Sequence, residues 1–207
     1  MTDPRTQVVE RGYDAIPDRF LEWRDQIVDD PRREWSGALT SRLADGARIL
    51  ELGCGAGVPD TFLLAERFRV TGVDISEEQI SRALANVPEA DFIRADFTAL
   101  ELEPAQFDAV AAFYSLNHVP RDLLAGLLES IYTWLVPGGL LLAAFGTSDT
   151  ESWTGEWLGT TMFFSSFPPA TTRRMLSSAG FELLRDELTP MREPEGDVDF
   201  HWVLARR

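Results

Sequence analysis

The sequence predicts an α/β fold built on a doubly wound, mostly parallel, Rossmann-like sheet with helices on both faces. Short apolar runs alternate with helix-like segments between residues 48 and 145, and this alternation is typical of doubly wound domains. The runs DAVAAF and LLLAAF are apolar at consecutive positions, as expected of parallel strands buried on both faces. A glycine-rich turn, GCGAG, directly follows the first run.

The chain before the first strand is predicted to be helical. This stretch runs from about Thr6 to Ala44, and Pro17 and Pro31 mark expected helix starts or breaks, because proline fits the first turn of a helix. We therefore divide the chain into a helical N-terminal segment, residues 1–44, and an α/β core, residues 45–207.

Five apolar runs are expected to form the parallel strands, and they lie at Arg48–Leu52, Val70–Val73, Asp91–Ile93, Ala109–Phe113 and Leu140–Phe145. Helices are expected in DTFLLAERF, EEQISRALANV and RDLLAGLLESIYTWL, which lie between these runs. In the last of them, Leu124, Leu128 and Ile131 fall on one helical face. A Pro-Gly-Gly break is expected between this long helix and the fifth strand.

Beyond Gly146 the pattern changes. Residues 147–168 form an aromatic-rich insertion, and PATTRRMLSSAG then reads as a helix. The C-terminal stretch, FELLRDELTPMREPEGDVDFHWVLARR, reads as two strands joined by a short loop. Two strands with so short a link must pair as a hairpin or lie adjacent.

The charged residues exclude several kinds of function. All 19 basic residues are arginine, so lysine-based chemistry, including Schiff bases and the phosphate-loop lysine, is excluded. The formal net charge of −15 opposes binding to a nucleic acid backbone.

The apolar residues and the soft metal ligands are equally informative. No apolar run approaches the roughly 20 residues needed to span a bilayer, and the N-terminus has no signal-peptide core, so we expect a cytoplasmic protein. Cys54, His118 and His201 are the only soft ligand candidates, too few for a zinc site without carboxylates or for an iron–sulfur cluster. We expect no metal.

The glycine turn is expected to approach a ligand. Gly53, Gly55 and Gly57 allow tight backbone bends with no Cβ in the way. A dinucleotide fingerprint has the spacing G-x-G-x-x-G, whereas this turn reads G-x-G-x-G with Val58 next. The spacing therefore disfavours a dinucleotide.

An acidic residue lies at the end of each of the first three predicted strands. These residues are Glu51, Asp74 and Asp96, and the carboxyl ends of parallel strands are where open α/β sheets bind ligands. Asp74 can accept hydrogen bonds from two ribose hydroxyls, and Asp96 from an exocyclic amine such as that of adenine. Three carboxylates suit a cationic nucleoside without phosphate better than a pyrophosphate.

These motifs resemble those of the class I S-adenosylmethionine-dependent methyltransferase family. The resemblance rests on ILELGCGAG, VTGVDIS, IRADF, FDAVAAFYSLNHVP and LVPGGLLLAAF, which span about Arg48 to Phe145 in the family's order. It implies a seven-stranded sheet that ends in the C-terminal hairpin, with residues 1–44 as a helical lid. It also implies an enzyme that uses S-adenosylmethionine to methylate a small molecule, producing S-adenosylhomocysteine.

Carried over to this sequence, the resemblance implies a cofactor site. Gly53, Gly55 and Gly57 would line the methionine part of S-adenosylmethionine, and Glu51 would lie beneath it. Asp74 would hold the ribose.

The remaining cofactor contacts implied by the resemblance come from four parts of the chain. Ile75 would pack on the adenine, and Asp96 and Phe97 would bind its edge. Ser115 would lie near the methionyl end. Tyr13 would close over the cofactor from the lid, where its ring could face the sulfonium charge.

Catalysis is expected to need positioning and exclusion of water more than a base. His118 in SLNHVP follows the fourth strand and is the candidate base, and Tyr13 is the second catalytic candidate; a purely structural role for either stays open. Trp153, Trp157, Met162 and Phe163 of the insertion are candidate substrate contacts. Packing or a dimer contact is the alternative interpretation of that segment.

Two other functions remain open at this stage. A non-catalytic S-adenosylmethionine-binding protein would show the same motifs, and a nucleotide-dependent oxidoreductase would use a related sheet. The acceptor, the methylated atom, and the choice between monomer and homodimer are not determined by the sequence.

Overall fold

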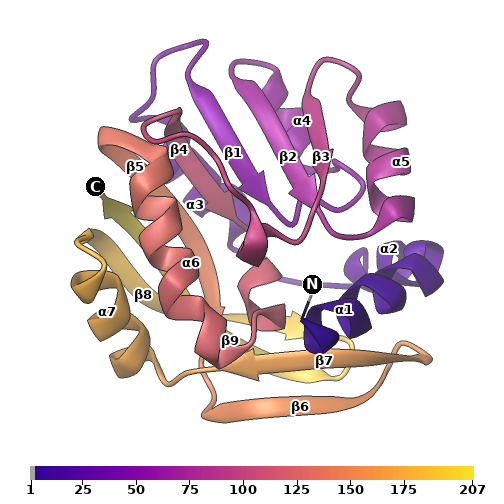
Figure 1. Ribbon diagram of the computed structural model, residues 1–207. Helices are drawn as coiled ribbons and strands as arrows, with labels where there is room; N and C mark the ends of the chain where they lie inside the picture. Colours follow the sequence, from indigo (N-terminus) through magenta and orange to yellow (C-terminus); the bar gives the residue numbers. More distant parts are fainter. Residues whose placement is uncertain (1–2) are drawn as a thin grey trace.

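The computed structural model describes residues 3–207, and its centre is a seven-stranded sheet with the strand order β3-β2-β1-β4-β5-β9-β8 (Figure 1). The strands of this sheet are β1 (Arg48–Leu52), β2 (Arg69–Asp74), β3 (Asp91–Arg94), β4 (Phe107–Ala112), β5 (Leu135–Gly146), β8 (Glu182–Glu193) and β9 (Gly196–Arg206). The first five are parallel, and β9 runs antiparallel to both β5 and β8. The predicted fold class, including the terminal hairpin, is confirmed.

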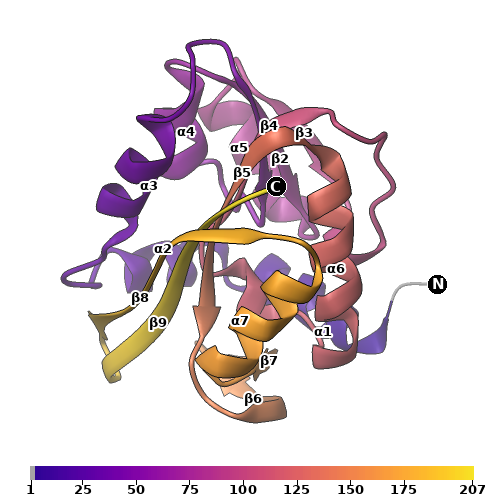
Figure 2. The same ribbon diagram turned by 90° about the vertical axis from the view of Figure 1, so that its left-hand side faces the viewer.

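Helices cover both faces of the sheet. In Figure 2, α3 and α4 lie on one side of the sheet, and α6 and α7 lie on the other. The helices are α1 (Pro4–Ala15), α2 (Pro17–Arg24), α3 (Arg32–Thr40), α4 (Asp60–Ala65), α5 (Glu77–Asn86), α6 (Arg121–Trp134) and α7 (Pro169–Ser178). Two short 3-10 turns, η1 (Phe97–Ala99) and η2 (Ser115–His118), follow β3 and β4. Among residues 3–207, none of the helices combines the length and the hydropathy that a membrane span requires.

The α3 helix belongs to the core and not to a lid. Its Trp35 and Leu39 are fully buried, and the Trp35 ring stacks on that of Trp202 in β9 with 5.6 Å between centroids. The segment predicted as a lid, residues 1–44, is therefore divided. Its first two residues lie outside the described part of the chain, α1 and α2 cover the sheet's end, and α3 packs on one sheet face.

The insertion after β5 is a separate hairpin of β6 (Thr150–Trp157) and β7 (Thr160–Ser166). In Figure 1 this hairpin and α1 lie beyond the ends of β1, β2 and β3 toward which the arrows point. Gly12 lets α1 approach β7 closely, because a Cβ there would lie 2.6 Å from the Met162 methyl carbon.

The long helix and the fifth strand are joined differently from the prediction. The α6 helix ends at Trp134 and β5 begins at the next residue, so the Pro-Gly-Gly sequence lies inside the strand. Gly138 has a φ of 81°, and the pairing of β4 with β5 shifts register between Phe107 and Ala109. The strand therefore absorbs the bend as an irregularity in the ladder.

Candidate active site

A cavity of about 510 Å³ lies at the carboxyl ends of β1, β2 and β4, a size typical of small-molecule sites. This is where the strand order reverses between β1 and β4, the place at which open α/β sheets bind ligands. Nine of the ten predicted cofactor residues line it: Tyr13, Glu51, Gly53, Gly55, Asp74, Ile75, Asp96, Phe97 and Ser115.

The glycine turn lies along the cavity wall in a left-handed backbone conformation. Gly53, Gly55 and Gly57 have φ angles of 76°, 54° and 76°, which favour glycine. A Cβ on Gly55 would meet only the Gln79 amide oxygen, at 3.7 Å, so its open side faces the cavity. Gly57 differs from the prediction, because it does not line the cavity. The side on which its Cβ would lie is occupied by Ala83 and Val87 at the end of α5.

Asp74 connects the glycine turn to the start of α5. Its Oδ2 accepts a 2.9 Å hydrogen bond from the Gly55 amide, and its Oδ1 accepts one of 2.9 Å from the Ser76 amide. Burial raises the pKa of Asp74 to about 6, although these two hydrogen bonds act in the opposite direction and lower it. A carboxylate has about four acceptor sites and Asp74 lines the cavity, so it can also accept hydrogen bonds from a ligand.

Glu51 lies at the base of the cavity and is 2% exposed. Its Oε2 accepts a 2.6 Å hydrogen bond from the Thr61 hydroxyl. Burial raises the pKa of Glu51, and the nearby Asp60 carboxylate raises it further. The neutral acid is therefore favoured until a cation enters the cavity.

The third predicted acid, Asp96, closes the turn after β3. Its Oδ1 accepts hydrogen bonds from the Thr98 amide, at 2.9 Å, and the Thr98 hydroxyl, at 2.6 Å. Ile75 and Phe97 lie beside it on the cavity wall. Ser115 lies across from Gly53 and donates a 2.5 Å hydrogen bond to the Leu52 carbonyl.

His118 and Tyr13, the two catalytic candidates, are in direct contact. The His118 Nδ1 lies 2.8 Å from the Phe163 carbonyl oxygen, and because a carbonyl only accepts, Nδ1 carries the proton. Nε2 is then an acceptor and receives the 2.9 Å hydrogen bond of the Tyr13 hydroxyl. Burial lowers the pKa of His118 to about 4 and raises that of Tyr13.

Five rings from α1, α2, β6 and β7 form what we call the aromatic wall of the cavity: Tyr13, Phe20, Trp23, Trp157 and Phe164. Neighbouring ring centroids are 5.3 Å apart for Tyr13 and Phe20, 5.3 Å for Trp23 and Trp157, and 5.6 Å for Trp157 and Phe164. Such edge-to-face arrangements are favourable between aromatic side chains.

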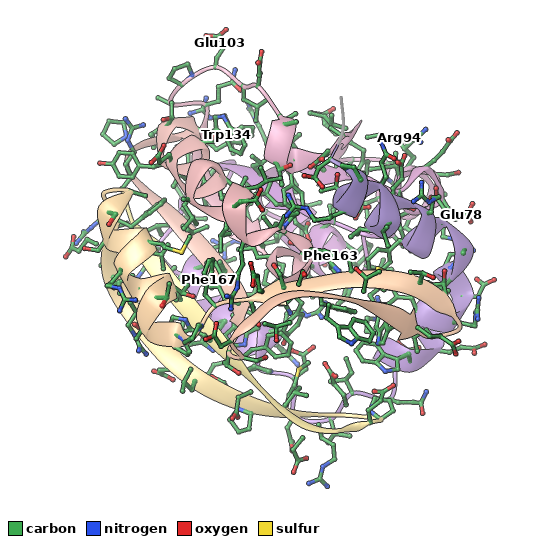
Figure 3. The ribbon with its side chains drawn as sticks, turned by 60° about the horizontal axis from the view of Figure 1, so that its bottom comes forward. Glu78, Arg94, Glu103, Trp134, Phe163 and Phe167 are labelled. Carbon is green, nitrogen blue, oxygen red and sulfur yellow. The ribbon has the colours of Figure 1, made fainter. Side chains whose placement is uncertain are left out.

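The other predicted substrate contacts do not line the cavity. Met162 and Phe163, the latter labelled in Figure 3, are at most 1% exposed and pack against Val9 and Ile16 around α1. Trp153 is 43% exposed and lies against Phe164 from outside. Of the four residues, only Trp157 faces the cavity, and Phe164, which is not among the four predicted contacts, is also a wall residue.

Two side chains on the cavity wall with buried polar atoms were also missed. Gln79 is 2% exposed, and neither atom of its amide has a hydrogen-bond partner within the described residues; the Asn117 Oδ1 also has none there. Buried polar atoms without partners are rare and costly, so these groups fit a polar ligand. The one available signal was the position of Gln79 in the first turn of α5, three residues after its cap Ser76.

Known proteins share both the sequence motifs and the fold. Residues 49–139 match the model of a family described as a methyltransferase domain. The chain is similar to 27-O-demethylrifamycin SV methyltransferase of Amycolatopsis mediterranei, at 36% identity over 58% of this chain and 52% of that protein. It is also similar to a ubiquinone biosynthesis O-methyltransferase of Idiomarina loihiensis, at 26% identity over 77% of this chain and 74% of the relative.

The chain thus spans about half the length of the rifamycin-related relative. Among solved structures, a methyltransferase from Methanosarcina mazei has the same fold, with a TM-score of 0.74 and 19% identity over 82% of this chain and 96% of that one. The family match begins inside β1, includes the whole glycine turn and reaches Gly139. It therefore covers the glycine turn and the ends of β1, β2 and β4, where the cavity lies. The match over residues 49–139 and these relatives thus support the resemblance to S-adenosylmethionine-dependent methyltransferases that the sequence motifs indicate.

Proposed function

We propose that this protein transfers a methyl group from S-adenosylmethionine to a small-molecule acceptor. The observation that carries the proposal is one continuous cavity. Its first part is lined by the glycine turn and three acidic strand ends, and its second part by the aromatic wall and the β8–β9 hairpin. A cofactor and a second, smaller molecule can therefore lie in contact with each other.

The residues of the first part fit the cofactor. Gly55 offers an open backbone surface, and Asp74 keeps acceptor sites for the two ribose hydroxyls. Asp96, Ile75 and Phe97 would hold the adenine. The unpartnered amide of Gln79 supports this fit, because a ligand with both donors and acceptors would satisfy it.

Glu51 would act on the methionine part. Its pKa is raised by burial, so an ammonium group placed near it would draw the carboxyl into its ionised form. Gly53 contributes by allowing Ser115 to lie close, since a Cβ on Gly53 would be 2.3 Å from the Ser115 Cβ. The two strand ends thereby remain close enough to enclose a narrow chain.

When bound, the cofactor supplies a methyl group already activated by its sulfonium charge, so the protein's task is alignment and exclusion of water. The α1 helix would provide the cover, and an ion pair and a hydrogen bond hold it in place. Glu10 pairs with Arg94 of β3 at 2.9 Å, and Asp14 accepts a 2.6 Å hydrogen bond from Ser76. Figure 3 labels Arg94 beside this helix.

Tyr13 and His118 would accept the proton of an acceptor hydroxyl. The Tyr13 oxygen would take that proton as its own proton passes to His118 Nε2, which is an unprotonated acceptor in the tautomer that the Phe163 carbonyl selects. A proton on His118 replaces the positive charge that methyl transfer removes from the cofactor. The total charge of the closed cavity therefore stays constant.

A titration followed by a turnover assay tests the proposal. S-adenosylhomocysteine should bind one site per chain, and methyl-labelled cofactor should label at least one compound of a small-metabolite library. Binding without any labelled product would identify a non-catalytic S-adenosylmethionine-binding protein. Tighter binding of NAD than of S-adenosylhomocysteine would identify the oxidoreductase alternative.

A further inference from the structure

Glu193 is a half-buried carboxylate on the acceptor side of the cavity. It is the last residue of β8 and pairs with Gly196, while Met191 pairs with Val198. Because side chains alternate along a strand, Glu193 shares a face with Met191 and Val198. That face packs toward the buried side of the hairpin, where Met191 is 4% exposed. Glu193 is the charged member of an otherwise apolar strip.

Within the described residues, the carboxylate of Glu193 has no hydrogen-bond or ion-pair partner. Its neighbours are engaged: Glu195 accepts from the Trp23 indole at 2.9 Å, and Arg192 pairs with Asp197 at 2.6 Å on the exposed side. Burial and the charge of Glu195 raise the pKa of Glu193 to about 7. A half-buried carboxylate without a cation is unfavourable unless a ligand supplies one.

The arginines that line the cavity cannot serve an anionic acceptor well. Arg32 pairs with Asp60 at 2.6 Å and with Asp30 at 3.3 Å. Arg24 donates to the Val58 carbonyl at 2.6 Å and pairs with Asp25 at 3.2 Å. Both guanidinium groups thus already have carboxylate or carbonyl partners within the protein.

The charge of the cavity favours a cation. Its lining includes two basic residues, Arg24 and Arg32, and six acidic ones, namely Glu51, Asp60, Asp74, Asp96, Glu193 and Asp199. A cleft with an excess of one sign of charge concentrates ligands of the opposite sign. The aromatic wall adds to this preference, because ring faces attract a cation in a desolvated site.

We infer that the methyl acceptor carries a protonated amine, which the Glu193 carboxylate binds while the acceptor's apolar part lies on the aromatic wall. This inference rests on the proposed function and names its substrate class. The amine is held away from the reacting atom: Glu193 lies on the β8–β9 hairpin beside the segment joining α2 to α3, where Val28 pairs with Arg192. Tyr13 and His118 lie on α1 and η2.

The test uses methyl-labelled S-adenosylmethionine and a library of small hydroxylated amines, each paired with its neutral N-acetyl derivative, together with neutral and acidic metabolites. Amines should be labelled at least about tenfold faster than their N-acetyl partners at limiting concentration, because the charged hydrogen bond is lost in the latter. N,N,N-trimethyl derivatives, which keep the charge and cannot be methylated at nitrogen, should still be labelled at their hydroxyl, because the amine is held away from the reacting atom. Equal or faster labelling of the neutral partners would overturn the inference.

The matched variants are Glu193→Gln and Glu187→Gln, which remove the same charge from the same strand. Glu187 is exposed and pairs with Arg185 at 2.7 Å, away from the cavity lining. Glu193→Gln should raise KM for amines about 10- to 100-fold and erase the preference over N-acetyl partners, with kcat and S-adenosylhomocysteine affinity changed less than about threefold. Glu187→Gln should change none of these.

The possible failures are distinct. If Glu193→Gln keeps the preference for amines, Glu193 does not bind the amine. If label enters only neutral or acidic metabolites, the protein is a methyltransferase with another acceptor class. If S-adenosylhomocysteine does not bind, or binds and nothing is labelled, the proposed function itself fails.

Discussion

The hydroxyl of Tyr13 donates a 2.9 Å hydrogen bond to Nε2 of His118, although the two residues are 105 positions apart in the chain. The contact joins the covering helix α1 to the turn that follows β4. It also fixes the histidine tautomer, together with the Phe163 carbonyl at Nδ1. A cover and a proton acceptor are thus parts of one hydrogen-bonded unit, which gives the first prediction.

Tyr13→Phe and His118→Gln should each lower kcat by about 10²- to 10⁴-fold, the usual contribution of a positioned acid or base. S-adenosylhomocysteine affinity should change less than about threefold for His118→Gln, because His118 lies on η2 and not on the covering helix α1. Because burial lowers the pKa of His118 to about 4, wild-type kcat should not fall between pH 7 and pH 6. An ordinary histidine, with a pKa near 6.5, would be partly protonated there.

Tyr132→Phe is the matched control for Tyr13→Phe. Tyr132 lies on α6, packs edge-on against Phe181, and does not line the cavity. Its loss of a hydroxyl should leave kcat unchanged. If Tyr13→Phe and His118→Gln retain wild-type rates across pH 6–9, the two residues only shape the site.

The sequence was sufficient for the strand ends of the sheet. Glu51, Asp74 and Asp96 lie at or shortly after the ends of apolar runs, and in a parallel sheet the ends of such runs must meet at one edge. The glycine turn could be predicted for the same reason. Gly57 shows the limit: a tight backbone bend was expected there, but the residue packs against α5, and only helix packing decides which side of a turn meets a ligand.

The acceptor side of the site could not be predicted, because distant hairpins build it. Which aromatic of the insertion faces inward depends on how α1 packs on β7, and this packing buries Met162 and Phe163 and leaves Phe164 to the cavity. Glu193 has no motif around it, and its environment comes from the pairing of β8 with β9. The unpartnered state of Gln79 likewise depends on tertiary structure.

Asp74→Asn should weaken S-adenosylhomocysteine binding by about 10²- to 10⁴-fold, since two charged hydrogen bonds to ribose would be lost or reduced. The amide can still accept from one of the two backbone donors that Asp74 now serves, Gly55 and Ser76, so the variant should fold. Calorimetric titration measures the effect. Asp91→Asn, at the opposite, exposed end of β3, is the control, and equal affinity for both variants would remove Asp74 from the site.

Gly53→Ala and Gly55→Ala should separate folding from binding. A Cβ on Gly53 would lie 2.3 Å from the Ser115 Cβ, so this variant should lose about 2 kcal/mol or more of unfolding free energy from overlap and a strained φ. On Gly55 the new methyl meets open space, and stability should fall only about 1 kcal/mol, whereas cofactor affinity should fall at least tenfold. Thermal melts with and without S-adenosylhomocysteine distinguish these effects, and the reverse order of sensitivities would contradict the geometry.

Glu51→Gln should stabilise the cofactor-free protein at high pH while weakening cofactor binding. Burial raises the pKa of Glu51 above its ordinary value of 4.5, so the folded state binds more protons than the unfolded state above about pH 4.5. Its contribution to stability is therefore lost as the pH rises, at a slope of at most about 1.4 kcal/mol per pH unit. Glutamine can still accept from Thr61 and does not titrate.

The Tm of the Glu51→Gln variant minus that of the wild type should thus grow between pH 5 and pH 8. Asp74, whose pKa is raised to about 6 by burial, adds the same trend to both proteins and cancels in this difference. Glu103→Gln, on an exposed loop between β3 and β4, should give a difference that is constant with pH. A constant or shrinking difference for Glu51→Gln would mean that Glu51 is already ionised at the base of the cavity, where Arg32 would then be its counter-ion.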